Sequence, residues 1–107
     1  MIQYGSDTVT HLKFRSFAPR LERRDAQWID IELAVDVDPA TPVPSGLAAM
    51  TALVICTHGG VIAQIVPLDE GTDCEFQFTA DEKDQIRAYI EDEAMQQAIA
   101  NLARGEV

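Results

Sequence analysis

Four side chains in this sequence have the chemistry to bind a transition metal: His11, Cys56, His58 and Cys74. Thiolate and imidazole are the groups that zinc prefers in proteins. Cys56 and His58 are two residues apart, so within a strand they would lie on the same face. The predicted turns place Cys74 on the opposite face and two strands away from Cys56, too far for a shared ion or a disulfide. We therefore predict no metal, no cofactor and two free thiols.

Cys56 and His58 could also form a nucleophile and its general base. Side chains at positions i and i+2 of a strand begin about 6.8 Å apart, whereas such a pair must lie within hydrogen-bond reach. His58, Gly59 and Gly60 fall at a predicted hairpin turn rather than at the start of a helix, unlike a phosphate-binding loop. We predict no catalytic residue, and the sequence favours a non-enzymatic protein over an enzyme.

The elements that position these residues predict a single α+β domain of residues 1–107. Its expected architecture is an antiparallel β-meander of about five strands followed by one long C-terminal α-helix packed on one face. The strands are predicted for residues 8–17, 28–37, 51–57, 61–67 and 73–78, and the helix for residues 80–104.

The clearest signals are in one strand and at the two ends of the helix. In residues 28–37 one face is wholly apolar and the other carries Asp30, Glu32 and Asp36, which is typical of a strand with one buried face. Thr79 and Glu82 have the spacing of a capping box at the start of a helix. Gly105 follows Arg104 as a C-terminal stop. Residues 18–27 contain Pro19 and three arginines, and are predicted to be a loop.

Two predicted turns decide which side chains of the last three strands share a face. A hairpin turn at Gly59 and Gly60 pairs Cys56 with Ala63, and a loop at residues 68–72 pairs Val66 with Cys74. The resulting core face would hold Leu53, Ile55, Ile62, Val66, Cys74, Phe76 and Phe78. The other face would hold Val54, Cys56, His58, Ala63, Ile65, Glu75 and Gln77, and it is also half apolar.

The predicted helix carries an apolar ridge that repeats every four residues from Ile86 to Leu102. Because a helix has 3.6 residues per turn, this ridge rotates by roughly 160° along its length, more than one flat sheet can cover. We expect the second half of the helix to present a separate apolar stripe to a partner. The alternative is that the first strand, or a kink near Asp92, covers this stripe within the chain.

The charge of the chain limits the partners that it can have. The formal net charge is −10, which disfavours direct binding to nucleic acid or to an anionic membrane. Residues 39–68 contain no Asp, Glu, Lys or Arg, but His58 and Gln64 interrupt them and acids flank them, so we predict no membrane span. The first residues do not resemble a secretory signal, which predicts a cytoplasmic protein.

The charges are also unevenly distributed. The first 27 residues hold five bases and three acids, and the rest of the chain holds three bases and fifteen acids. If the first two strands are antiparallel neighbours, Lys13 and Arg15 would lie beside Asp30, Glu32 and Asp36, and the charges would pair across the strands. The alternative is a basic ligand-binding patch.

The leading functional hypothesis is a small acidic protein-interaction domain, a regulator or accessory subunit that binds a protein partner or itself as a homodimer. The half-apolar face and the second helical stripe motivate it. The candidate interface residues are Met95, Ile99, Leu102, Val54, Ala63 and Ile65.

Two alternatives come from other functional classes. An acidic decoy could occupy a nucleic-acid-binding site on another protein, because acids two residues apart along a strand have nearly the spacing of adjacent phosphates. The row concerned is Asp30, Glu32, Asp36 and Asp38. The second alternative is a small ligand-binding or catalytic module near His58 and Cys56.

Overall fold

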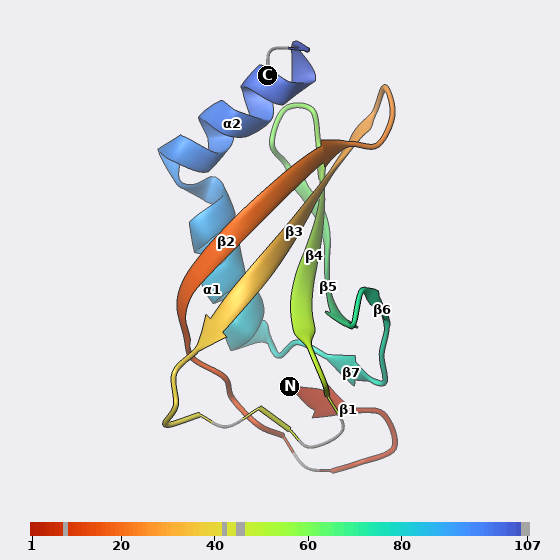
Figure 1. Ribbon diagram of the computed structural model, residues 1–107, viewed down its shortest axis with the longest axis vertical. Helices are drawn as coiled ribbons and strands as arrows, with labels where there is room; N and C mark the ends of the chain where they lie inside the picture. The colour runs from red at the N-terminus through yellow and green to blue at the C-terminus, as the bar shows by residue number, and fades with distance from the viewer. Residues whose placement is uncertain (8, 42, 45–46, 106–107) are drawn as a thin grey trace.

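Five antiparallel strands form the main sheet, in the order β2-β3-β4-β5-β6, and two helices lie against one of its faces (Figure 1). The computed structural model describes residues 1–7, 9–41, 43–44 and 47–105. The elements are β1 (Ile2–Gln3), β2 (Phe14–Arg23), β3 (Trp28–Val37), β4 (Met50–Thr57), β5 (Ile62–Asp69), β6 (Thr72–Asp73), β7 (Phe76–Gln77), α1 (Ala80–Glu91) and α2 (Glu93–Ala103). The predicted α+β class, with an antiparallel sheet of five strands, is therefore confirmed.

The first long strand lies further along the chain than predicted. β2 begins at Phe14 and continues to Arg23, through residues that we expected to form a loop. Residue 8, the predicted start, lies outside the described residues. Pro19 is compatible with this strand because β2 is at the edge of the sheet, where β3 is its one neighbour. A proline on the open side of an edge strand removes no ladder hydrogen bond.

β3 has the predicted bounds and the predicted alternation. Its side chains Ile29, Ile31 and Leu33 are fully buried. In the register with β4, Ile29 lies opposite Cys56 and Ile31 opposite Val54. Since directly opposed residues share a face of the sheet, the helix-covered face of β4 carries Val54 and Cys56.

The predicted core face of β4 and β5 is therefore wrong at Leu53, Ile55 and Val66, whereas Ile62 packs against the core as predicted. Val54, Cys56 and Ile65 are buried under the helices, whereas Leu53, Ile55 and Val66 lie on the opposite face. The core cluster also contains Ile29, Ile31, Leu33, Ala52, Phe76, Phe78, Ile86, Ile90, Met95 and Ile99.

The error arose at the second turn. Glu70 and Gly71 have positive φ values of 51° and 80°, so they form a two-residue hairpin turn that pairs Asp69 with Thr72. The predicted loop was one residue out of register. A shift of one residue exchanges the two faces of a strand, which is why Phe76 and Phe78 were assigned to the face of Leu53.

The last predicted strand is two short strands in two different sheets. β6 pairs with β5 over only two residues, and the chain then turns away. β7 pairs instead with β1, in the register Ile2 with Gln77 and Gln3 with Phe76. β7 is therefore hydrogen-bonded to the N-terminal segment and not to β5, as seen at the lower end of the sheet in Figure 1.

The predicted single long helix is also wrong, because the helix breaks at Asp92. The predicted capping box is present, with Thr79 as N-cap and Glu82 bonded back to it. Asp92 has an extended backbone, with φ −62° and ψ 148°, and separates α1 from α2. Its position is the kink that the sequence offered as an alternative.

The break changes which helical residues face the sheet. The buried residues are Ile86 and Ile90 in α1, then Met95 and Ile99 in α2. Their spacing of four, five and four residues replaces the regular repeat of four, so Ala94 is exposed. The extra residue at the break turns the apolar side of α2 back toward the sheet. The sheet therefore buries apolar residues of both helices.

A glutamine joins the helix break to the β4–β5 hairpin. The side-chain amide of Gln96 donates to the carbonyl oxygens of Ile90 and Gly60, at 2.9 and 3.3 Å. Gly60 has a φ of +84°, and a Cβ there would lie 2.2 Å from Gln96 Oε1. The backbone conformation therefore favours glycine at this turn, and a Cβ there would displace the Gln96 side chain from its hydrogen bonds.

Glu82 is a buried carboxylate that connects three segments. Its carboxylate accepts hydrogen bonds from the amide of Thr79 at 2.7 Å, the amide of Leu12 at 2.8 Å and the amino group of Met1 at 2.6 Å. Glu82 and the Met1 amino group are both fully buried. A buried charge is tolerated when an opposite charge and hydrogen bonds satisfy it, as here.

Replacing Glu82 by alanine should destabilise the fold by about 3–5 kcal/mol, because it leaves a buried ammonium without its counter-ion. Denaturant unfolding followed by circular dichroism would measure the change. Glu93→Ala is the matched control, since Glu93 is an exposed acid in the first turn of α2. It should change stability by no more than about 1 kcal/mol. Equal effects of the two substitutions would contradict the structural role of Glu82.

Candidate functional site

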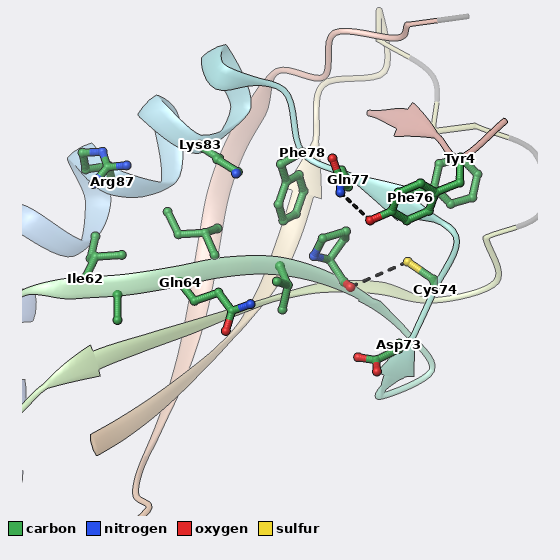
Figure 2. A pocket seen from close by; sticks show the side chains of 14 residues that line it. Tyr4, Ile62, Gln64, Asp73, Cys74, Phe76, Gln77, Phe78, Lys83 and Arg87 are labelled. Atoms are coloured by element: carbon green, nitrogen blue, oxygen red, sulfur yellow. Dashed lines mark hydrogen bonds between the residues drawn. The ribbon is translucent and has the colours of Figure 1, made fainter. Parts of the chain in front are cut away.

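A groove with a volume of about 570 Å³ follows the outer edge of β5 (Figure 2). β5 forms one side of it, and the segment from β6 to the start of α1 forms the other. Its polar lining residues are Tyr4, Gln64, Asp73, Gln77, Lys83 and Arg87. Its apolar lining residues include Ile62, Ile65, Val66, Pro67, Phe76 and Phe78.

The groove exists because β5 is only partly covered on its outer side. β6 pairs with Leu68 and Asp69, and within the described residues no strand pairs with the outer side of residues 62–67. β7 would have been the natural neighbour, but it pairs with β1. The outer edge of β5 is thus an open strand edge inside a groove.

Main-chain groups of β5 point into this groove. The amide of Glu70 donates to Ala49 on the β4 side, and Asp69 pairs with Thr72 on the outer side. Because successive residues of a strand direct their main-chain groups to alternate sides, those of Ile65 and Pro67 point outward. The Cys74 thiol donates to the outward carbonyl of Pro67 at 3.6 Å, and Figure 2 draws this bond as the dashed line from Cys74. Ile65 therefore offers both an N–H donor and a carbonyl acceptor to the groove.

Two unpaired cations lie along the α1 side of the groove. Of the eight Lys and Arg residues, all within the described part of the chain, only Lys83 and Arg87 make neither an ion pair nor a side-chain hydrogen bond. Figure 2 shows both extending from α1 on the side of β5 that carries Ile62. One end of the groove is therefore positively charged.

The opposite end has a different character. Asp73 of β6 lies there, beyond Cys74 (Figure 2). Gln77 donates a hydrogen bond to the hydroxyl of Tyr4, which fixes the wall formed by β7. Between the two ends, the lining is mostly apolar, with Phe76 and Phe78 buried. The groove thus has main-chain hydrogen-bonding groups, an apolar middle and a charge difference from end to end.

The residues predicted to be capable of chemistry lie apart from one another. Cys56 is fully buried under the helices, whereas Cys74 lines the groove. His58 Nε2 lies 2.9 Å from the carbonyl oxygen of Asp25, in the β2–β3 turn, and His11 is exposed. Within the described ranges, no group of three or more His, Cys, Asp or Glu side chains is arranged to hold a metal ion.

The Cys56 thiol and the Asp25 carboxyl, which lies beside His58, have shifted pKa values. Burial raises the pKa of the Cys56 thiol to about 11, and the negative charge of Asp30 acts in the same direction. The amides of Gln27 and Trp28 donate to Asp25, each at 2.8 Å, and lower the pKa of this carboxyl. At neutral pH the Cys56 thiol is therefore protonated and a poor nucleophile. His58 and Asp25 connect two turns of the sheet.

Most of the predicted interface residues are covered by the chain itself. Met95, Ile99, Val54 and Ile65 are at most 6% exposed, and Leu102 packs partly buried against the core. The burial of the two α2 residues follows from the break at Asp92. Ala63 is exposed and lines the groove. That these residues contact a partner stays a prediction, and Ala63 is the one of the six that is exposed.

The acidic row proposed for a decoy is largely ion-paired. Asp36 pairs with Arg15 at 2.9 Å, Glu32 with Arg20 at 3.0 Å and Asp30 with Arg24 at 2.9 Å. Arg15 pairs as predicted; the cation of Lys13 instead lies 3.8 Å from Asp81 of α1. Three of the four acids therefore form ion pairs within the chain, which weakens the row as a phosphate mimic; the decoy function itself stays a prediction.

Sequence reasoning missed the groove and its two cations. Lys83 and Arg87 were visible as a basic pair at positions i and i+4, on the same side of a helix in an acidic chain. Nothing local to them indicated a groove, because it depends on the pairing of β7 with β1, segments more than 70 residues apart.

Comparison with protein-family models, with curated proteins and with solved structures finds no match for this chain. In the described part of the chain, no helix is long and apolar enough to cross a membrane. The functional conclusion therefore depends on the groove and its chemistry.

The two cysteines should differ strongly in reactivity. In the folded protein at pH 8, we expect Ellman's reagent to modify Cys74 and to leave Cys56 intact, because Cys56 is buried and its pKa is about 11. Denaturant should then expose the second thiol. A Cys74→Ser variant should lose the reaction of the folded state, and a Cys56→Ser variant should keep it. Fast modification of Cys56 in the folded protein would contradict the structure.

Proposed function

We propose that this protein is a non-enzymatic protein-interaction module that binds an extended segment of a partner protein as an added strand on β5. The observation that carries the proposal is the open outer edge of residues 62–67, which lies inside a groove. Strand addition of this kind uses main-chain hydrogen bonds for affinity and side-chain contacts for specificity.

The dimensions of the site suit a peptide. Six residues of strand extend for about 20 Å, and the groove runs along this length. Ile65 offers both its N–H and its carbonyl to a second strand, whereas Pro67 has no N–H and its outward carbonyl already accepts the Cys74 thiol. The apolar lining would take alternate side chains of the bound segment.

The walls of the groove favour a single strand over a second folded copy at this site. Lys83 and Arg87 of α1 line one end of the groove, and residues 73–78 form the wall opposite β5. A second copy has the same walls around its own β5, so the two edges would be kept apart. A single extended peptide has no such walls and can therefore lie in the groove beside β5.

Phage display of random seven-residue peptides on the wild-type protein would test this function. We expect the selected peptides to shift the NMR amide signals of Ile65 and Phe76, on the two sides of the groove. The amide of Ile65 should exchange rapidly with solvent in the free protein and become protected on binding, because it points outward. Those of Gln64 and Val66, which point toward β4, should be protected throughout.

Protein alkylated at Cys74 with N-ethylmaleimide is the control, because the adduct would stand in the groove. It should lose the selected peptides, whereas a Cys74→Ser variant should retain them. Failure to select any peptide, or shifts confined to residues away from β5, would overturn the proposal.

A second surface supports self-association as an additional candidate function. Leu53, Ile55 and Val66 lie on the face of the sheet opposite the helices, are half-buried, and are not among the described residues that pack in or against the core. Leu53 and Val66 are direct cross-strand partners, so the three side chains form one apolar patch. Two such patches could pack together in a homodimer.

Light scattering with size-exclusion chromatography would test the dimer. We expect the wild type to run as a dimer at high micromolar concentration, and Leu53→Asp to run as a monomer because the new charge lies in the patch. Val61→Asp is the control, since Val61 is an exposed apolar residue at 67% and is not part of the patch. A monomeric wild type would rule out this candidate.

A further inference from the structure

We infer that the segment bound along β5 is acidic at the end that lies beside α1, where Lys83 and Arg87 hold its carboxylates. This inference rests on the proposed function and adds the chemistry of the partner. The evidence for it is the two cations and their surroundings. Strand addition by itself does not require cations in the groove.

The two cations are exceptional within this protein. The other Lys and Arg side chains have polar partners, such as Glu32 for Arg20 and Asp36 for Arg15. In a chain with a net charge of −10, acids are abundant, yet Lys83 and Arg87 have no anionic partner within the described residues. Both of them line the groove.

Their spacing makes an anion favourable at this place. Residues four apart on a helix are neighbours, and like charges at this spacing repel each other and destabilise the helix. A carboxylate between Lys83 and Arg87 would remove this repulsion. The guanidinium of Arg87 can bind a carboxylate with two parallel hydrogen bonds, and the Lys83 ammonium adds a compact charge.

The bland alternative is that the pair only keeps the helix surface hydrated. Arg87 and Glu91 are themselves at positions i and i+4, which would allow an ion pair along the helix. The structure has no such ion pair. Lys83 is half-buried against the groove rather than fully exposed, which favours a role at the site.

The groove also indicates the polarity of the bound segment. Asp73 lies at the end opposite the two cations, so a second acid at that end would be repelled. The middle is apolar. The inferred ligand is therefore an extended peptide with one or two Asp or Glu residues at the α1 end, apolar residues in the middle, and no acid near Asp73.

To test this inference, the display experiment with random seven-residue peptides is repeated on two double variants of the protein, and the selected peptides are compared with those from the wild type. Lys83→Gln with Arg87→Gln removes the cations of the groove. Lys13→Gln with Arg23→Gln is the matched control, because it also removes one Lys and one Arg, both exposed and outside the groove lining. Peptides selected on the wild type should carry acids clustered at one end.

Resynthesised peptides then give a double-mutant cycle. On the wild type, replacing the peptide's Glu residues by Gln should weaken binding by about tenfold, as expected for two partly exposed ion pairs. On the Lys83→Gln/Arg87→Gln variant, the same replacement should have no effect. On the control variant it should still cost about tenfold. Salt should reduce the preference, because the pairs are accessible to solvent.

The outcomes separate the two proposals. If the selected peptides bind at β5 but carry no acids, or if the acid preference survives in the Lys83→Gln/Arg87→Gln variant, the inference about acidic partners is wrong and strand addition stands. If no peptide shifts the β5 signals, the proposed function fails as well. Amide spectra of each variant would establish that it is folded.

Discussion

The buried carboxylate of Glu82 is the interaction on which the rest of this structure depends. It completes the N-terminal cap of α1, and it binds the amino group of Met1 and the amide of Leu12. Holding Met1 beside α1 brings Ile2 and Gln3 to the position where they pair with β7. Because β7 pairs with β1, it does not pair with β5, and the groove remains open. A capping residue thus contributes, through the pairing of β1 with β7, to keeping the outer edge of β5 accessible.

The second constraint is that both faces of the sheet are rich in apolar residues, while the helices cover only one. β3 determines which face the helices cover, because one of its faces is wholly apolar and its register with β4 fixes which side chains of β4 share that face. The break at Asp92 then lets two short helices follow the twisted sheet and bury residues that a continuous helix would have rotated away from it. The uncovered face retains Leu53, Ile55 and Val66 as the patch assigned to self-association.

Some of this could be predicted from sequence, and the rest could not for specific reasons. The β3 pattern and the Thr79–Glu82 cap are local signals, and both were predicted correctly. β2 was misplaced because Pro19 disfavours an inner strand but is acceptable at an edge, and edge position is a property of the whole sheet. The register after the turn of Glu70 and Gly71 was predicted one residue out, which assigned Phe76 and Phe78 to the face of Leu53 and so identified the wrong face of β4 as the core face. The groove was not predicted because it results from a long-range pairing, and Lys83 and Arg87 acquire meaning only beside it.

The amide of Gln96 has a consequence for how the molecule opens. It is bonded at once to the last turn of α1, through Ile90, and to the tip of the β4–β5 hairpin, through Gly60. Detaching α2 from the sheet must break the bond to the hairpin, and fraying of the hairpin must break the same bond. Hydrogen exchange should therefore register these segments as one cooperative unit of local unfolding, although they are more than 30 residues apart in sequence.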